Sequence, residues 1–206
     1  MTTRTDDAPR GPEISLDHVV LRPGDHVGVF YRGDKERDAF LLPVIADAIA
    51  AGCRVIYVCD RDGPEQVAEQ LAAGSTGVDG AIERGQLRLI ASREAYLATG
   101  IFDPYRMVDF YKNAAEAGYT EDSPIPCVIG EMSWSLRGCP GSERLIEYEA
   151  LYAKEFADAA VITLCLYDLE QTRGEQIFDL LRLHGRVVLN GIEMHNPRVA
   201  PLMLLD

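Results

Sequence analysis

Six short apolar runs, separated by longer segments with helical periodicity, constrain the fold of this chain more than any other feature. The runs span residues 26–31, 54–59, 87–91, 126–131, 160–167 and 186–190. Such alternation of strands and helices is typical of an α/β domain with a mainly parallel sheet. Because the runs are apolar at nearly every residue instead of every second one, we expect helices to cover both faces of the sheet.

The segments between these runs carry helix start signals. A proline follows an aspartate at residues 62–64 and again at 103–104, and both patterns predict a helix N-terminus. Thr172 and Glu175 have the spacing of a capping box. Pro43 interrupts a helical segment, which predicts either a kink or a break into two helices.

Two further patterns refine the expected fold. Asn190 and Gly191 separate two strand-like runs, so we expect a C-terminal antiparallel hairpin that adds one strand to the sheet. The segment between the fourth and fifth runs has four apolar residues spaced to share one helix face, namely Leu145, Tyr148, Tyr152 and Phe156. Residues 73–80 are expected to form a loop that is followed by a short helix.

Length and charge limit the domain count and the function classes. With 206 residues the chain is expected to form one domain at 14–198, preceded by a flexible leader at 1–13 and followed by an apolar tail at 199–206. The net charge of −13 repels phosphate backbones and anionic lipids, and no Lys/Arg cluster reverses it locally. This balance argues against direct binding of nucleic acid.

Cysteine usage and the apolar segments indicate the compartment. The five cysteines include no C-x-x-C pair, and four of them lie in or beside apolar runs, where a thiol behaves as a small buried hydrophobe. No apolar stretch is long enough for a membrane span, and the first residues carry no apolar signal segment. We therefore expect a cytoplasmic protein with no membrane association.

Aromatic and acidic side chains follow the strands at the edge where parallel sheets bind ligands. Ligands of open parallel sheets lie beyond the carboxyl ends of the strands. The candidates at these ends are Tyr31, Asp60, Glu131, Trp134, Tyr167 and Asp168. Glu131 directly continues a buried strand, so it must be solvated, paired or bound to a ligand.

Each candidate also has a structural interpretation. Asp60 and Asp168 have the position of helix N-caps, and Tyr31 and Tyr167 could close the core with their hydroxyls in water. A single tryptophan such as Trp134 is more often part of a core or an interface than of a site.

The histidines predict no metal site. His26 precedes its strand, at the edge opposite the expected pocket, and a structural hydrogen bond is the expected role. His184 lies on the apolar side of a helical segment, as core histidines often do. Glu193 and His195 alternate on one strand face but lack a third ligand.

The usual catalytic motifs are not found in the sequence. The first strand is followed by "RGDKERDAF", where a phosphate-binding loop would need several glycines and a Ser or Thr after the lysine. Ser133 is outside any G-x-S-x-G elbow, Cys139 lies in a turn without an identifiable base, and no dinucleotide fingerprint follows a strand. We expect a protein that is not an enzyme and needs no cofactor.

Four sequence blocks resemble the MEDS family of sensory domains. The blocks are "GDHVGVFY" at 24–31, "GEMSW" at 130–134, "ERLIEYE" at 143–149 and "LCLYD" at 164–168, and their order and spacing also match, from about residue 24 to about residue 197. The resemblance implies a RecA-like three-layer α/β sandwich without the phosphate loop, similar to the circadian-clock ATPase in fold. It also implies binding of a small hydrocarbon-derived ligand.

The resemblance implies ligand contacts and a signalling partner. Matching positions suggest Tyr31, Glu131, Trp134, Tyr148 and Tyr167 as binding residues. Glu131 would accept a hydrogen bond or face a cation, and Trp134 would cover an apolar face. Family members often carry a kinase, an anti-sigma module or a DNA-binding segment in the same chain, and nothing outside this sensory region is long enough for one. We therefore expect a stand-alone sensor that acts through a separate kinase, anti-sigma factor or transcription regulator, or by forming a homo-oligomer.

Two rival interpretations remain open at the sequence level. A degenerate RecA-like enzyme would bind nucleotide through Asp60, Glu131 and magnesium, and the missing glycine-rich loop speaks against it. A protein-interaction scaffold would dock its apolar tail, "VAPLMLLD", on a partner, although this tail could equally pack on its own domain. Deletion of residues 199–206 distinguishes the scaffold, because a ligand pocket would survive the deletion.

Overall fold

A computed structural model describes residues 13–16, 19–116 and 125–196 of the protein. The predicted tail at 199–206 and all but the last residue of the predicted leader lie outside the described residues.

A seven-stranded sheet organises the molecule, and all six apolar runs form strands in it, as predicted. The strand order is β5-β4-β6-β7-β3-β8-β9, with every pair parallel except β8 and β9. The strands are β3 (His26–Tyr31), β4 (Arg54–Cys59), β5 (Leu87–Ala91), β6 (Pro126–Glu131), β7 (Ile162–Asp168), β8 (Arg186–Leu189) and β9 (Ile192–His195).

The C-terminal hairpin is also confirmed. Asn190 and Gly191 form the two-residue connection between β8 and β9, and their φ angles are +52° and +72°. A two-residue turn of this kind needs positive φ at both positions, which asparagine and glycine tolerate best. The hairpin therefore adds β9 as the antiparallel edge strand.

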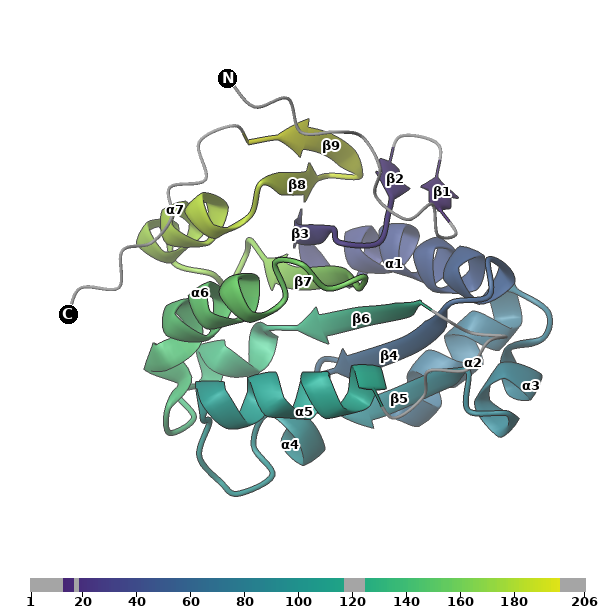
Figure 1. The fold of residues 1–206 in the computed structure, drawn as a ribbon, viewed down its shortest axis with the longest axis horizontal. Coiled ribbons are helices and arrows are strands. Elements are labelled where there is room, and N and C mark those ends of the chain that lie inside the picture. The colour runs from purple at the N-terminus through teal and green to yellow at the C-terminus, as the bar shows by residue number, and fades with distance from the viewer. Residues whose placement is uncertain (1–12, 17–18, 117–124, 197–206) are drawn as a thin grey trace.

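Helices cover both faces of the sheet and give the molecule three layers (Figure 1). One face carries α1 (Gly33–Ala50), α2 (Pro64–Gly74) and α3 (Val78–Glu83). The other face carries α4 (Ser92–Ala95), α5 (Pro104–Glu116), α6 (Leu145–Glu155) and α7 (Gly174–Leu183). Two short 3₁₀ helices, η1 (Ser133–Arg137) and η2 (Ser142–Arg144), connect β6 to α6. The three-layer α/β sandwich predicted from the sequence is therefore confirmed.

Three local features refine or correct the sequence-based expectation. First, α1 runs through Pro43 as one helix, so a break into two helices is excluded. Second, the capping box is wrong: Arg173 is the N-cap of α7 without a side-chain hydrogen bond, and the Thr172 hydroxyl instead donates to the carbonyl of Asp168 at 2.7 Å. That hydroxyl stabilises the turn after β7.

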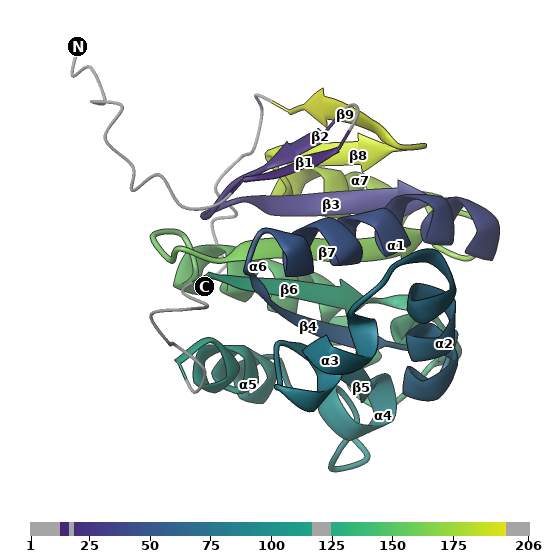
Figure 2. The ribbon, with the colours of Figure 1, turned by 90° about the vertical axis from the view of Figure 1, so that its right-hand side faces the viewer.

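The third difference is an additional hairpin before the sheet. Strands β1 (Ile14–Leu16) and β2 (Val19–Leu21) pair antiparallel and lie beside α1 and β8 in Figure 2. Ile14, Val19 and Leu21 are buried in the core on the α1 side of the sheet. The sequence did not predict this hairpin because strands of three residues carry too little periodicity to be recognised.

None of the helices in the described part of the chain is both long and apolar enough to cross a bilayer.

Candidate functional site

Glu131 ends β6 at the carboxyl edge of the sheet and is fully buried. Its Oε1 accepts hydrogen bonds from Arg37 Nη1 at 3.1 Å, Ser133 Oγ at 3.4 Å and the Tyr31 hydroxyl at 3.5 Å. Its Oε2 accepts from the backbone N–H groups of Asp60 and Arg61, at 2.7 and 3.1 Å, and from the Tyr57 hydroxyl at 3.2 Å. A buried carboxylate needs such donors, and here both oxygens have several.

Arg37 supplies the positive charge that opposes Glu131. It lies in the second turn of α1, and only 2% of its surface is exposed. Its guanidinium also contacts Asp38 at 2.7 Å, Asp62 at 2.5 Å and Asp34 at 3.5 Å. Burial alone would lower the pKa of Arg37, but the charge of Glu131 and other nearby acidic groups raise it, so the side chain stays charged.

Asp60 extends the same polar network at the end of β4. Both oxygens of Asp60 accept hydrogen bonds from Arg137, at 2.5 and 2.6 Å, and its carboxylate also accepts from the hydroxyls of Ser133 and Ser92. Burial alone would raise the pKa of Asp60, but these hydrogen bonds lower it below its ordinary value. Asp60 is therefore an ionised member of the network and not a helix N-cap.

We call this set the carboxyl-edge network. It comprises Tyr31, Arg37, Tyr57, Asp60, Asp62, Ser92, Glu131, Ser133 and Arg137. The structure thus brings together three of the residues predicted as ligand-binding, Tyr31, Asp60 and Glu131, and they bond to protein groups.

Trp134, Tyr148 and Tyr167 belong instead to the apolar core on the α5–α7 side of the sheet. Trp134 is fully buried; its ring stacks on Tyr96 at a centroid distance of 4.9 Å and contacts Phe102 at 4.5 Å. Tyr148 meets Phe102 edge-on at 5.6 Å. Tyr31 therefore shares the polar environment of Asp60 and Glu131, whereas the other three aromatic candidates lie in the core on the opposite face of the sheet.

Asp168 orders the turn that follows β7. Its carboxylate accepts hydrogen bonds from the Glu170 backbone N–H at 2.9 Å and the Gln171 side-chain amide at 2.7 Å. Arg61 lies 3.7 Å away. Asp168 is thus occupied within its own loop and caps a turn instead of a helix.

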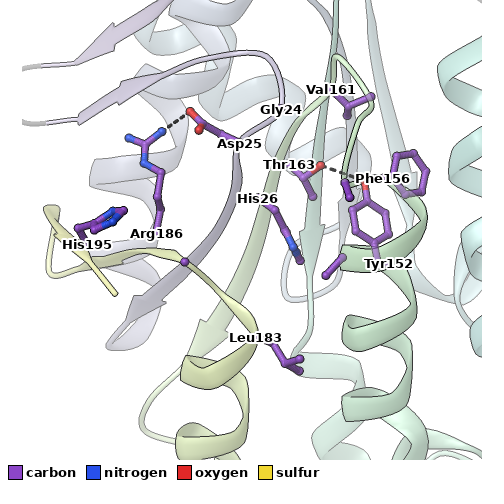
Figure 3. A pocket seen from close by; sticks show the side chains of 13 residues that line it. Gly24, Asp25, His26, Tyr152, Phe156, Val161, Thr163, Leu183, Arg186 and His195 are labelled. Carbon is purple, nitrogen blue, oxygen red and sulfur yellow. Dashed lines mark hydrogen bonds and ion pairs between the residues drawn. The ribbon is translucent and has the colours of Figure 1, made fainter. Parts of the chain in front are cut away.

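A cavity of about 600 Å³ opens at the opposite edge, where the parallel strands begin (Figure 3). We call it the amino-edge cavity. The apolar part of its wall comes from Tyr152 and Phe156 at the end of α6, with Val161 and Leu183. Polar groups on the wall come from His26, Arg186 and His195. Arg186 is held by ion pairs with Asp25 and Glu193.

Behind His26, four side chains converge on one buried point; we call His26, Glu149, Cys165 and His184 the His–Glu–Cys cluster. His26 Nε2 lies 3.4 Å from Cys165 Sγ and 3.5 Å from Glu149 Oε2. His184 Nε2 lies 3.6 Å from the same Glu149 oxygen. Burial and the neighbouring His26 lower the pKa of His184 to about 4, so this imidazole is neutral at pH 7.

Sequence reasoning missed the residues that define these two centres. Arg37 stands in a charged segment of α1, where nothing distinguishes it from surface arginines. Glu149 did carry a signal, because it follows Leu145 by four residues and precedes Tyr152 by three, which places a carboxylate on the apolar face of α6. His26 and His184 each lack a sequence signal for a shared site, but the fold places their ring centroids 4.4 Å apart.

Two solved structures resemble this fold. The crystal structure of flagellar accessory protein FlaH from Methanocaldococcus jannaschii superposes with a TM-score of 0.62 at 10% identity, covering 89% of this chain and 84% of that one. The crystal structure of KaiC-like protein PH0186 from Pyrococcus horikoshii OT3 gives 0.58 at 13% identity, covering 80% and 70%. At such identities the likeness concerns the fold alone, and it is RecA-like. No curated protein matches the sequence.

The family comparison goes further than the fold. The model of the family described as "MEthanogen/methylotroph, DcmR Sensory domain" matches residues 25–185, which is most of the chain. The match begins just before β3 and ends just after α7, so it contains both the carboxyl-edge network and the His–Glu–Cys cluster. The protein therefore belongs to the MEDS family of sensory domains.

Proposed function

We propose that this protein is a non-catalytic sensory module that binds a small organic ligand in the amino-edge cavity and regulates a separate signalling protein. The amino-edge cavity is the observation that carries this proposal. Its volume of about 600 Å³ is within the range of small-molecule sites. Apolar walls with a few polar groups suit a small ligand that has one polar end, and Arg186 would face that end.

The carboxyl edge, which the sequence suggested as the ligand site, is the second candidate. There both oxygens of Glu131 are engaged by protein donors, and Trp134 is covered. The groove beside it, lined by residues such as Met132, Tyr167 and Asp168, has no room for a water molecule. A ligand would first have to displace protein hydrogen bonds, so we favour the amino-edge cavity.

The connection between β3 and α1 supports a role without ATP hydrolysis. Arg32 alone separates the end of β3 from the start of α1 at Gly33. A phosphate-binding loop needs several consecutive backbone N–H groups around the phosphates, and a one-residue connection is too short to provide them. Arg37, the nearest buried cation, is already paired with carboxylates.

The protein that receives the signal is also part of the proposal. A kinase, an anti-sigma factor or a transcription regulator would receive the signal, or the module would change its own oligomeric state. Phe178 on α7 and Ile192 on β9 are 66% and 60% exposed and are apolar contacts that such an interface could use. Light scattering with and without ligand tests the oligomeric alternative.

The first experiment is a thermal-shift screen of the purified protein. The panel holds small organic acids, alcohols, amines and halocarbons, with magnesium-ATP as a separate arm, because a ligand that binds only the folded state raises the unfolding midpoint. For each compound that raises the midpoint, calorimetry then gives affinities for Ala153→Phe, which fills the amino-edge cavity, and for Ala72→Phe, a matched change at an exposed position of α2. We expect at least a tenfold loss with Ala153→Phe and none with Ala72→Phe.

Two results would reject parts of this proposal. Unchanged affinity in Ala153→Phe, together with a large loss in Glu131→Gln, would move the ligand to the carboxyl edge. A shift with magnesium-ATP alone, accompanied by phosphate release, would replace the sensory proposal with a nucleotide-dependent enzyme.

A further inference from the structure

The His–Glu–Cys cluster brings together four metal-binding side chains from four parts of the fold. His26 begins β3, Cys165 lies in β7, Glu149 projects from α6, and His184 directly follows α7. One donor atom from each residue lies within 4.8 Å of every other donor atom. Glu149 and His184 are completely buried, and Cys165 is 2% exposed.

Four of the six distances between these donors are close to the edge length of a coordination tetrahedron, and the other two are no longer than 4.8 Å. Four of the separations are 3.4, 3.5, 3.5 and 3.6 Å. A tetrahedral ion with bonds of about 2.0–2.3 Å, as for Zn²⁺ with nitrogen, oxygen and sulfur ligands, places its ligands about 3.3–3.8 Å from one another. The four side chains therefore converge closely enough for one ion to bind after small side-chain adjustments.

The orientation of His184 leaves a ring nitrogen available for a ligand bond. Its Nδ1 lies 2.8 Å from the carbonyl oxygen of Leu180, so Nδ1 carries the proton and donates to that carbonyl. Its Nε2 then presents a lone pair toward the Glu149 carboxylate, and Nε2 makes no hydrogen bond among the described residues. Metal-bound histidines usually have this arrangement, with the second nitrogen donating to a backbone carbonyl.

The incomplete hydrogen bonding of the Glu149 carboxylate is a second, independent indication of a cation site. Its Oε1 is buried and makes no hydrogen bond of ordinary geometry in the described part of the chain, although the Tyr167 hydroxyl is a neighbouring donor to this carboxylate. Oε2 accepts a hydrogen bond from the Cys165 thiol at 3.5 Å, and His26 Nε2 lies 3.5 Å away. His184 Nε2, at 3.6 Å, has no proton to donate to it. An incompletely satisfied carboxylate in a dry interior is costly, and a bound cation removes that cost.

Gly28 keeps open the space that the His184 ring occupies. A Cβ atom at Gly28 would lie 3.0 Å from His184 Cγ and 3.3 Å from its Cβ. Gly28 also pairs directly with Cys165 across β3 and β7. The glycine thus allows the imidazole to approach the sheet close to the thiol.

We propose that the His–Glu–Cys cluster binds one divalent transition-metal ion, with Zn²⁺ best suited to its two imidazoles, one thiolate and one carboxylate. This inference does not depend on the proposed sensory function. A thiolate and a carboxylate together neutralise a divalent cation, so the buried site would carry no net charge. Imidazole and thiolate ligands favour zinc-class metals over Mg²⁺ and Ca²⁺, which prefer oxygen.

His26 gives the ion a route into the protein. The side chain of His26 is 18% exposed and lines the amino-edge cavity, whereas the other three ligands are buried. In Figure 3 the His26 ring points away from Arg186 and His195, toward Tyr152. A metal ion would therefore enter through the cavity and bind behind its wall.

The test uses Co²⁺ as a spectroscopic probe on chelator-treated full-length protein. Cobalt bound to a thiolate gives a charge-transfer band in the near ultraviolet, and tetrahedral cobalt gives strong visible bands. We expect both at one equivalent per chain, with loss of the bands when Zn²⁺ is added. Cys165→Ala should abolish the thiolate band, and Cys127→Ala is the matched control, since Cys127 is an equally buried thiol in the neighbouring strand β6.

A second pair of variants tests the imidazole ligand by zinc competition against a chromophoric chelator. His26→Gln should weaken zinc binding by more than about tenfold, the lower limit seen even for changes outside the ligand set. His195→Gln changes a histidine that lines the same cavity but is not in the cluster, and it should leave zinc affinity unchanged. Circular dichroism confirms that each variant is folded.

Three outcomes would overturn the metal site. They are a folded wild-type protein that binds no cobalt, a thiolate band of equal strength in Cys165→Ala, and equal zinc affinity in His26→Gln and His195→Gln. Any of these would leave the cluster as a hydrogen-bonded core group.

Discussion

Arg37 and Glu131 form a buried ion pair whose stability depends on both partners being present. Their side chains are 2% and 0% exposed and lie 3.1 Å apart. Removing one member of such a pair leaves an uncompensated charge in the interior, whereas removing both members removes the charge problem itself. The pair is therefore strongly coupled, even if its net contribution to stability is small.

We predict that Arg37→Met alone and Glu131→Met alone each lower the free energy of unfolding by about 3–5 kcal/mol, and that the double variant loses less than the sum. Urea unfolding of the four proteins measures this coupling. Strictly additive losses would mean that the two side chains act independently, because Tyr57 and the backbone N–H groups of residues 60 and 61 already satisfy Glu131.

Trp134 acts as a core residue of the α5–α7 layer. Because its ring is fully buried between Tyr96 and Phe102, we predict that Trp134→Ala lowers the free energy of unfolding by about 3–5 kcal/mol. Trp134→Phe, which keeps an aromatic ring, should lose less. Urea unfolding followed by circular dichroism gives both values, and a change below about 1 kcal/mol for the alanine variant would show that the site is not tightly packed.

At the scale of elements, the connection from β6 to α6 depends on Gly141. Gly141 precedes η2 with φ of +85°, and a Cβ atom there would collide with the backbone of Phe102. The same contact region holds a hydrogen bond from the Phe102 N–H to the Pro140 carbonyl at 2.8 Å. Because Phe102 packs on Trp134, this glycine sets how closely the segment before α5 approaches the tryptophan.

We predict that Gly141→Ala destabilises the protein more than Gly52→Ala does. Gly52 has a similar φ of +81° but open space around it, so its variant measures backbone strain alone, about 1–2 kcal/mol. Gly141→Ala adds the collision with Phe102. Paired thermal and urea unfolding compares the two variants, and equal losses would indicate that the Phe102 segment moves aside freely.

At the scale of the whole molecule, negative charge is in large excess. The net charge is −13. Three of the arginines, Arg37, Arg137 and Arg186, are already paired with carboxylates inside networks. The remaining acidic groups repel one another, and that repulsion weakens when salt shortens the screening length from about 30 Å at 0.01 M to about 8 Å at 0.15 M.

We therefore predict that the thermal unfolding midpoint rises when sodium chloride is increased from about 0.01 to about 0.15 M. The Arg37–Glu131 pair is buried and screened less, so Arg37→Met should retain the rise. A midpoint that falls with salt would mean that exposed attractive pairs such as Lys112–Glu155 outweigh the general repulsion.

Most strands and helix starts of the sheet domain follow from local patterns in the sequence. The strands recognised from apolar runs and the Asn190–Gly191 turn depend on local side-chain pattern and backbone preference, which each segment carries within itself. Arg106 likewise donates its backbone N–H to Asp103, as the predicted start of α5 required. The β1–β2 hairpin and the failed Thr172 capping box mark where tertiary packing overrides such local signals.

Which polar side chains contact one another depends on the tertiary fold. Glu131 and Trp134 are close in the sequence, but after β6 their side chains diverge. The Glu131 carboxylate bonds to Arg37, whereas the Trp134 indole packs in the core on the α5–α7 side of the sheet. His26 and His184 are 158 positions apart in the chain, and their rings meet because the residues between α7 and β8 lie beside the start of β3. Contacts between distant residues depend on strand order and helix placement, and neither is encoded in any single segment.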